Sequence, residues 1–332
     1  MKLPVSRKAF FLVTVLSSIT FLTVIVTQVS DMVFQSANVV SSVKDSLFAD
    51  SVCDSALEIV KRILQDDIQK NGYDFYSDDF TNTDELWSKT YILPVDIIYG
   101  TVRAVITDES GKLNINSLVD SYGKSEGLAK GGYLLALQKF FKIFNMSETI
   151  ASYILDWIDS DSEGMFEQRV SRNWFIPYPD ELLKLLENFG VQDFSRLFSQ
   201  YFDGREDATG SPYLTFWPYA AALKINVNTA PKEVIASIID TPDSMDIAVK
   251  IEDERRRSPF KSFSEFVSFL QKFIPVKKER FFNIEPTFLF DVRSDVFSVK
   301  LYCKARDNQV GIFSVIYRPY QGQMKTLAFR RF

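Results

Sequence analysis

The chain is constrained first by an uninterrupted run without charged side chains, Ala9 to Ser30, close to the N-terminus. A helix needs about 20 predominantly apolar residues to cross the hydrocarbon layer of a membrane. Basic residues precede the run at positions 2, 7 and 8, and Asp31 follows it. Since basic flanks stay on the cytoplasmic side, the sequence predicts one membrane-spanning helix over residues 10–30, with the bulk of the chain outside the cytoplasm.

A cleaved secretory signal is the alternative interpretation of this run. The apolar region of such a signal is only about 7–15 residues long and ends at a small-residue cleavage site. The run here is longer, and the helical pattern does not stop where the run ends. We therefore favour a retained helix.

Beyond the run, apolar residues continue to recur mostly at three- and four-residue steps, which is typical of a helix with one apolar face. Apart from Pro4, neither Gly nor Pro occurs before Gly72. The sequence predicts one rod from Phe10 to about Gln69, roughly 90 Å long at ~1.5 Å per residue. The recurring positions are Val33, Ala37, Val40, Val43, Leu47, Val52, Ala56, Ile59 and Ile63.

The composition excludes most enzymatic and metal chemistry. The chain has no histidine, which removes the commonest general base and every His-ligated metal site. Only Cys53 and Cys303 are present, so four-thiolate sites are excluded, and the sequence does not decide whether the two form a disulfide. We predict no catalytic residues, no enzymatic activity and no organic cofactor. A net charge of −5 disfavours nucleic acid as a partner, and proteins are expected instead.

Strand-like segments flank a mostly helical block. They are β-branched and partly alternating, and they lie at Tyr91–Ile98, Gly100–Thr107, Phe288–Val292, Val296–Ala305 and Val310–Tyr317, with a hairpin turn at Arg306–Gln309. This order predicts an α+β fold in which a helix-on-sheet module at both chain ends is interrupted by an inserted α-domain.

The helical block carries cap signals and an approximate internal repeat. Asp180 is predicted to cap a helix that ends at Gly190, and Ser262 with Glu265 forms a capping box. The repeat pairs Lys112–Ser117 with Lys224–Thr229, and Ile150–Asp156 with Ile247–Asp253. Its Asn-x-Asn-Ser/Thr runs are typical of turns and helix N-caps, with Pro231 in the first turn of the following helix.

Two sets of residues resemble a known family. Lys8-Ala9-Phe10-Phe11, followed by the long helix, resembles a type IV prepilin-like N-terminus. The segments Asp108–Asn116, Ile154–Asp161 and Lys224–Pro231 occur in the order and approximate spacing of the general secretion pathway K proteins, the K-type minor pseudopilins of type II secretion systems. Together the motifs span most of the chain.

The resemblance implies a pilin-like module with a large inserted all-α domain containing degenerate helix-hairpin-helix repeats. It implies the following division: a basic leader over 1–9, a transmembrane helix over 10–30, stem and first strands over 31–119, the insert over 120–283, and C-terminal strands over 284–332. It also implies a single-pass inner-membrane protein with its bulk in the periplasm. The implied function is to cap the tip of the pseudopilus and take part in protein export across the outer membrane.

The resemblance further implies partners and processing. The partners are the I- and J-type minor pseudopilins, then the H-type, the major pseudopilin and the prepilin peptidase. Cleavage between Ala9 and Phe10, with methylation of Phe10, is implied, although the family usually has Gly before the cut. Thr14 then stands where pilins carry a Glu that neutralises the N-terminus of the subunit ahead. K-type pseudopilins also lack this Glu, which suits a terminal subunit.

An acidic run offers a candidate metal site. Asp156, Asp159, Asp161 and Glu163 crowd together at a predicted helix end. Calcium accepts six to eight oxygen ligands in flexible geometry and would relieve their repulsion. K-type proteins are associated with calcium, so the resemblance favours this hypothesis. A solvated acidic helix terminus without metal explains the same residues, and the sequence leaves both interpretations open.

A second function is compatible with part of the sequence. Asn226–Pro231 with Arg255–Arg257 resembles the helix-hairpin-helix DNA-binding modules of competence proteins. The alternative is therefore a membrane-anchored DNA-uptake protein or a minor type IV pilin. Such modules hold phosphate on a Gly-rich turn, whereas the corresponding stretch here carries Asp240 and Asp243. Because these carboxylates would repel a phosphate, DNA binding is the weaker hypothesis.

Overall fold

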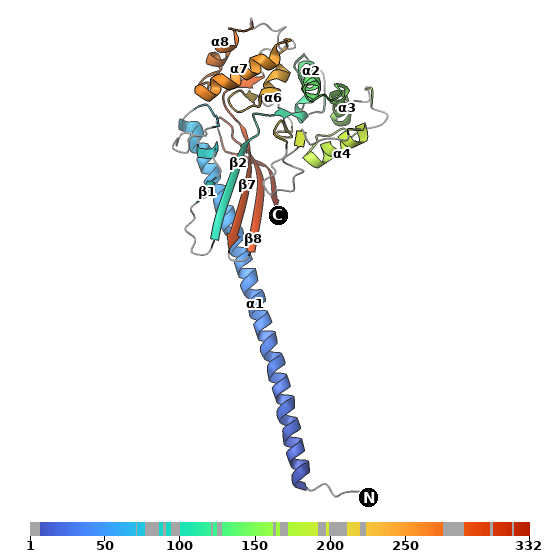
Figure 1. Ribbon diagram of the computed structural model, residues 1–332, viewed down its shortest axis with the longest axis vertical. Helices are drawn as coiled ribbons and strands as arrows, with labels where there is room; N and C mark the ends of the chain where they lie inside the picture. Colours follow the sequence, from blue (N-terminus) through green and yellow to red (C-terminus); the bar gives the residue numbers. More distant parts are fainter. Residues whose placement is uncertain are drawn as a thin grey trace.

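A single long helix carries a compact head in the computed structural model (Figure 1). The helix, α1 (Arg7–Lys70), is continuous and spans about 95 Å at ~1.5 Å per residue. It confirms the predicted rod. The structure describes residues 7–70, 72–76, 86–88, 91–93, 100–120, 122–124, 128–161, 164–166, 172–191, 197–198, 211–219, 224–274, 289–305, 308–320 and 322–332.

The upper half of α1 lies on a five-stranded antiparallel sheet of strand order β1-β2-β7-β8-β9. The strands are β1 (Tyr91–Leu93), β2 (Gly100–Asp108), β7 (Val296–Ala305), β8 (Asn308–Tyr317) and β9 (Lys325–Arg331). The predictions of β2, β7 and β8 are confirmed. Of the predicted strand at Tyr91–Ile98, positions 94–98 lie outside the described residues. The strand β9 was not predicted, because its alternation is broken by adjacent Leu327 and Ala328.

The side chains that α1 buries against the sheet are Ala49, Cys53, Ala56, Leu57, Val60 and Leu64. They meet Val102, Ala104 and Ile106 of β2, Phe297, Val299, Leu301 and Cys303 of β7, and Ile312 and Ile316 of β8. The predicted apolar face was wrong in part, since Ile59 is 41% exposed. Apolar residues stand side by side at 56–57, 59–60 and 63–64, so periodicity alone does not select the buried face.

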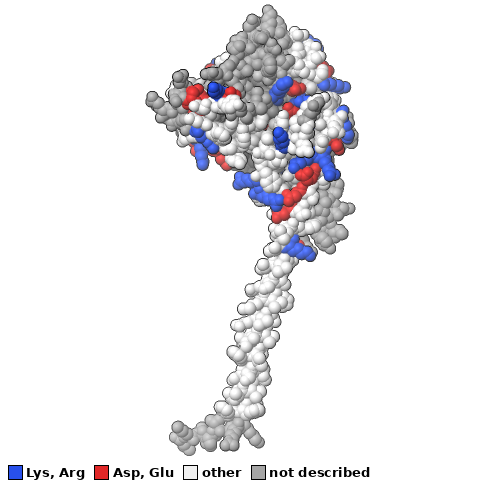
Figure 2. All heavy atoms as spheres, turned by 180° about the vertical axis from the view of Figure 1, so that it is seen from behind, with Lys and Arg blue, Asp and Glu red and all other residues white. Residues whose placement is uncertain are grey.

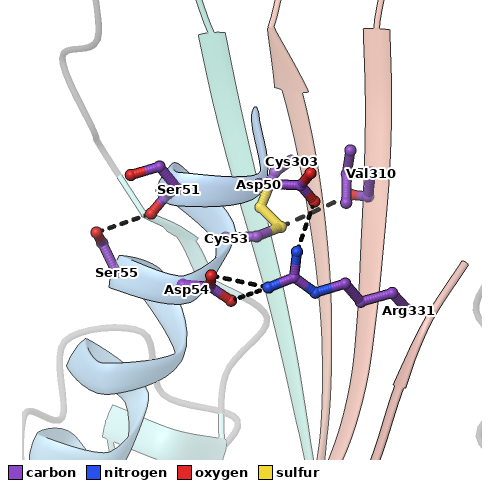
Figure 3. Close-up of a disulfide and its surroundings, with 8 residues drawn as sticks. All are labelled: Asp50, Ser51, Cys53, Asp54, Ser55, Cys303, Val310 and Arg331. Carbon is purple, nitrogen blue, oxygen red and sulfur yellow. Dashed lines mark hydrogen bonds and ion pairs between the residues drawn. A yellow bond between two sulfur atoms is a disulfide. The ribbon is translucent and has the colours of Figure 1, made fainter. Parts of the chain in front are cut away.

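Two interactions hold α1 against the sheet around positions 50–54 of the helix (Figure 3). Cys53 forms a disulfide with Cys303 of β7. Arg331 reaches from β9 to the same part of the helix and pairs with Asp50 at 2.9 Å and Asp54 at 2.6 Å. The disulfide settles a pairing that the sequence left undecided.

The chain leaves the sheet after β2 and returns at β7, which pairs directly with β2. The intervening segment forms the outer part of the head (Figure 1). Its helices are η2 (Ile115–Leu118), α2 (Leu128–Ile143), α3 (Thr149–Ile158), α4 (Pro179–Phe189), α6 (Lys232–Ile238), α7 (Ser244–Arg257) and α8 (Phe263–Leu270). A short helix η1 (Leu86–Ser88) precedes the sheet, and its Trp87 is buried beneath α1.

The prediction of an all-α insert was wrong in detail, because the insert holds two short parallel strand pairs. One joins β3 (Leu113–Asn114) to β4 (Leu214–Thr215), and the other joins β5 (Ile225–Asn226) to β6 (Phe290–Asp291). The predicted strand at Phe288–Val292 therefore contributes to the insert and not to the main sheet. A sequence pattern identifies a strand but not its partner, which here lies more than 60 residues away.

Aromatic and aliphatic side chains form a core that continues from the insert to one face of the sheet. Trp217 contacts Phe313 of β8, with ring centroids 5.9 Å apart. Gly190 ends α4 in the left-handed conformation and Ser262 caps α8, as predicted. The prediction that Asp180 caps α4 was wrong, because the helix begins at Pro179 and Tyr178 occupies the cap position. Pro231 is the N-cap residue of α6.

We predict that removing the Cys53–Cys303 bond lowers the free energy of unfolding by about 2–4 kcal/mol, because the bond closes a very long loop in the unfolded chain. Thermal melts of the full chain in neutral detergent, with and without reductant, measure the effect. The double variant Cys53→Ala with Cys303→Ala is the control and should melt at the same temperature in both buffers. An unchanged wild-type melt after complete reduction would contradict the prediction.

Candidate functional site

The lower half of α1 is the largest unpartnered apolar surface in the described part of the chain. Every residue from 9 to 44 whose side chain is described is exposed, and the helix is long and apolar enough to cross a membrane. Figure 2 shows it as a rod almost without charge below the charged head. The uncharged run from Ala9 to Ser30 corresponds to about 33 Å of helix, close to the thickness of a hydrocarbon layer.

Five of the hydroxyl groups within this run donate hydrogen bonds to the backbone of the helix itself. Thr14 Oγ1 donates to the carbonyl of Phe10 at 2.6 Å, and Ser18, Thr20, Thr23 and Thr27 make the same kind of bond one turn back. An unsatisfied polar group in hydrocarbon is costly. These residues are therefore compatible with a lipid or helix-packed environment.

The structure places Ala9, Phe10 and Thr14 in the first turns of α1, and Phe10 is 69% exposed. Positions 1–6 lie outside the described residues. Cleavage at Ala9-Phe10 and the significance of Thr14 stay predictions.

Beyond the membrane-length run, the exposed helix has two unlike faces. Val33, Val40 and Leu47 recur at seven-residue steps and are 61%, 67% and 65% exposed, so they form one apolar stripe, here called the stem seam. Gln35 and Ser42 project from the opposite side at about 100° per residue. Asn308 of β8 donates to the Ser42 carbonyl at 2.9 Å on the face opposite the stem seam, whereas the stem seam itself is exposed and available to another helix.

The acidic run does not converge on one point. Asp156 and Asp159 are buried near the end of α3, whereas Asp161 is exposed. Within the described residues, no group of three or more Cys, Asp or Glu side chains could hold a metal ion. Glu163 lies outside the described residues. The described carboxylates therefore do not make a calcium site on their own.

Asp156 instead organises the following loop. Its Oδ2 accepts a hydrogen bond from the Phe166 backbone N–H at 2.7 Å. Gly164 packs so closely on this carboxylate that a Cβ there would lie 2.4 Å from Asp156 Cγ. Burial raises the pKa of Asp156, with Asp161 adding to the rise. This contact is a structural role that the sequence could not reveal, because the partner is a backbone group.

The two copies of the Asn-x-Asn repeat have matching contacts. Asn114 Oδ1 accepts from the N–H of Asn116, and Asn226 Oδ1 accepts from the N–H of Asn228, at 3.0 and 2.9 Å. The second Asn of each copy binds both backbone groups of one distant residue. Asn116 pairs in this way with Ile176, and Asn228 with Phe260.

This pairing gives the predicted repeat a physical meaning. In each copy the first Asn ends a short parallel strand and turns the chain, and the second fixes a segment that follows the next helices. All four Asn side chains are buried. Because a buried amide without hydrogen bonds costs free energy, the second Asn of each copy keeps its turn attached to the segment that it binds. The helix-hairpin-helix geometry of the repeats stays a prediction.

Within the arginine cluster Arg255–Arg257, the first two side chains have different surroundings. Arg255 is partly buried and donates to the carbonyls of Val227 and Ala230, so it supports the second Asn turn. Arg256 is exposed and pairs with Glu252 at 3.3 Å. Burial lowers the pKa of Arg255 to about 10, which leaves it charged at neutral pH. One of the three cations is thus unavailable to a nucleic acid.

The loop between α6 and α7 contains both carboxylates that were weighed against DNA binding, Asp240 and Asp243. The carbonyls of Ile239 and Thr241 accept hydrogen bonds from the Lys139 ammonium at 2.5 and 3.3 Å. This cation comes from the helix of the other repeat copy. Lys139 therefore supplies the hydrogen bonds that these two carbonyls accept.

A buried polar junction joins the stem, the sheet and the insert. Arg318, at the end of β8, donates to the carbonyl of Leu64 and to Asp67 in the last turns of α1, and also to Asp74 and the carbonyl of Ser294. Its guanidinium lies 4.7 Å from the Phe297 ring centroid. This junction leaves no recognisable pattern in the sequence, because its members come from separate segments of the chain.

Asp108 extends the junction into the insert. Its Oδ2 accepts from the hydroxyls of Ser294 and Thr229, and its Oδ1 accepts from the N–H of Ser110 at 2.7 Å. Burial outweighs these bonds and raises the pKa of Asp108 to about 6. Burial, with the nearby Asp74 carboxylate, also raises the pKa of Asp67.

Comparison with known proteins gives similarity to a protein family and to a solved structure. Residues 225–273 match the family model of the type II secretion system (T2SS), protein K. No curated protein sequence matches the chain. A chain of the crystal structure of the GspK-GspI-GspJ complex from the enterotoxigenic Escherichia coli type 2 secretion system has a similar fold, with a TM-score of 0.61 and 14% identity. The match covers 87% of this chain and 98% of that chain.

The fold and the bare stem define an α+β protein with one apolar N-terminal helix fit for a membrane anchor. Within that class, both comparisons support the resemblance to a K-type minor pseudopilin. The sequence match covers β5 to α8, which is the second Asn-x-Asn copy together with its clamped residue Phe260.

We predict that Asp108 makes stability fall as pH rises. A carboxyl whose pKa is raised in the folded state stabilises fully below its unfolded pKa, about 3.9, and loses this contribution as pH rises through about 6. Asp108→Asn removes this titration. Between pH 4 and 7 the free energy of unfolding of the variant should therefore rise relative to that of the wild type by on the order of 2–3 kcal/mol.

Thermal unfolding of the full chain in neutral detergent across this pH range measures the gain. Asp246→Asn, at an exposed position of α7, is the matched control and should stay parallel to the wild type. Parallel curves for Asp108→Asn and the wild type would contradict the prediction.

Proposed function

We propose that this chain is a minor pseudopilin of the K type, which caps the tip of a type II secretion pseudopilus and takes part in protein export across the outer membrane. The observation that carries the proposal is the stem: a continuous helix whose lower half is apolar and bare, while its upper half is fixed to a large head. The match of residues 225–273 to the protein K family supports it.

The stem explains how such a subunit would assemble. The segment 10–30 lies in the inner membrane, and the head lies in the periplasm. The stem seam then packs against stems of related subunits, since a bare apolar stripe of a helix is buried only by another helix or by lipid. No catalytic step is required for this role.

Two features favour the tip over the shaft of the filament. Thr14 bonds to its own helix and offers no charge to the N-terminus of a subunit ahead. The insert enlarges the head beyond the helix and sheet (Figure 1). Head-to-tail contacts build open filaments, and a subunit with an oversized head and no acid at this position is suited to end one.

The proposed partners are the I- and J-type minor pseudopilins, followed by the H-type and the major pseudopilin. The matched crystal structure contains a GspK-GspI-GspJ complex, which supports the first two. Processing by the prepilin peptidase between Ala9 and Phe10, with methylation of Phe10, belongs to the same proposal. Mass spectrometry of the mature N-terminus tests it directly.

We predict that Val40→Asp lowers co-purification of the full chain with co-expressed I- and J-type subunits at least tenfold, because it places a charge in the stem seam. Gln35→Asp introduces the same charge on the opposite, polar face and should leave co-purification within about twofold. Both side chains are exposed on α1, so the melting temperature of either variant should not change. Equal losses for both variants, or no loss for Val40→Asp, would refute assembly through the stem seam.

Calcium binding by the acidic run is a further proposal. The site would need ligands beyond the described carboxylates, and Glu163 is the candidate that the sequence offers. We predict that a chelator lowers the melting temperature of the wild type and not that of Asp161→Asn. Asp180→Asn, an exposed substitution outside the run, should respond to the chelator as the wild type does. A wild-type melting temperature that does not change when the chelator is added would contradict calcium binding.

A further inference from the structure

The strands of the main sheet place an excess of positive charge on one face. α1 lies along the other face, where Leu301 and Cys303 of β7 pack against it (Figure 1). Successive side chains of a strand point to opposite faces of its sheet. Lys300 and Lys304 of β7 therefore lie on the face away from α1, and Lys304 is exposed.

Each of the strands β2 and β9 adds a cation to this face. Arg103 lies opposite Tyr302 of β7, and Arg330 lies opposite Phe313 of β8. Both arginine side chains are exposed. Arg331, the neighbour of Arg330, forms its ion pairs with α1, as expected for the opposite face. The four cations are here called the basic sheet face: Arg103, Lys300, Lys304 and Arg330.

The sheet does not balance this charge with acidic side chains. The five strands contain one carboxylate side chain, that of Asp108, which is buried at the end of β2. The adjacent Glu109 is also buried and forms an ion pair with Lys112 at 2.8 Å. Lys304 and Arg330 form no ion pair within the part of the chain that the structure describes. Like charges on one face of a sheet repel one another, and an anionic partner would relieve this repulsion.

An exposed aromatic ring lies beside these cations. Phe332 exchanges both backbone hydrogen bonds with Gly311, at 2.7 and 3.0 Å. Its ring covers Gly311 so closely that a Cβ there would overlap it, and it packs edge-on against Tyr302 with centroids 5.9 Å apart. The ring is still 55% exposed. A terminal carboxyl group at Phe332 leaves four cations facing one anion. An exposed aromatic ring in such a patch is typical of an interface anchor.

The basic sheet face has the dimensions of a contact with a short peptide segment. Lys300 and Lys304 are four residues apart on one strand, which is about 13 Å at ~3.3 Å per residue. Lys300 and Arg330 both lie opposite Phe313, so they are two strand spacings apart, about 10 Å. The insert borders the patch, since Trp217 contacts Phe313.

The position of the patch argues against lipid headgroups. Cys303, next to Lys304, is bonded to Cys53 of α1. The 23 helical residues from Ser30 to Cys53 correspond to about 35 Å at ~1.5 Å per residue. No side chain spans that distance to the membrane. Duplex DNA also fits poorly, because its binding requires many phosphates to be neutralised and the chain carries a net charge of −5.

The basic sheet face points away from the stem seam. Ala56, which α1 buries against the sheet, follows Leu47 of the stem seam by nine residues. At about 100° per residue this is half a turn around the helix. The sheet therefore lies on the side of α1 opposite the stem seam, and the basic sheet face lies on the far side of that sheet. A partner bound there is distinct from a helix packed on the stem seam.

We propose that the basic sheet face binds an acidic segment of a protein partner. Lys304 and Arg330 pair with Asp and Glu side chains of that segment, and Phe332 contacts an apolar side chain between them. Complementary charge steers such a partner to the surface and sets its register. The inference does not depend on the function proposed above, since it concerns only the exposed surface of the head.

The test uses the full chain in neutral detergent and a fluorescent nona-glutamate peptide, whose anisotropy reports binding at low and at moderate salt. We expect binding that weakens as salt is added. Lys304→Glu and Arg330→Glu should each weaken it at least fivefold without changing the melting temperature. Lys184→Glu reverses an exposed cation of α4 in the insert and is the matched control, which should bind within twofold of the wild type.

A second peptide tests the aromatic contact. Replacing the central residue of the nona-glutamate peptide by Phe should tighten its binding to the wild type at least twofold. Phe332→Ala should abolish this advantage and leave binding of the nona-glutamate peptide within twofold. If the two peptides bind the wild type equally, the role proposed for Phe332 is wrong.

Four results would overturn the proposal. The first is that the wild type binds neither peptide at low salt. The second is unchanged binding in both Lys304→Glu and Arg330→Glu. The third is an equal loss in Lys184→Glu, which would indicate a general effect of net charge. The fourth is tighter binding of a 20-base-pair DNA duplex, lost in the same two variants, because the surface would then serve nucleic acid. If charge reversal lowers the melting temperature, Lys304→Gln and Arg330→Gln provide the test: both should fold and bind at least twofold more weakly.

Discussion

The arrangement of stem and head depends on one buried cation. The guanidinium of Arg318 binds the last turns of α1 through Leu64 and Asp67, the following loop through Asp74, and the return from the insert through Ser294. A buried charge is tolerated only when its partners stay in place. These hydrogen bonds thereby join the end of α1, the end of β8 and the entrance to the insert at one point.

Much of the fold could be predicted from the sequence because its signals are local. The charge-free run and the absence of Gly and Pro specify α1, and alternation specifies β2, β7 and β8. Two features could not be predicted. The pairing of Phe290–Asp291 with Ile225–Asn226 depends on contacts between distant segments, and the buried face of α1 depends on the sheet that covers it.

The candidate sites also contain features that the sequence reveals and features that it does not. The bare stem was visible in the sequence, and so was the Asn-x-Asn repeat, whose cap-like pattern is local. The clamps on Ile176 and Phe260 were not visible, because an Asn side chain that binds a distant backbone leaves no pattern there. The acidic run was found, but burial of Asp156 against Gly164 and Phe166 gives that carboxylate a structural use that composition cannot reveal.

The disulfide has a mechanical consequence. It joins α1 to β7 near the noncovalent contacts that Ser42 and Asp50 make with the sheet, so tension along the rod acts on a covalent bond as well as on these contacts. Disulfides form in oxidising compartments and are rare in the cytosol. Oxidation of the two thiols therefore adds a covalent link through which a push or a pull on the rod reaches the head.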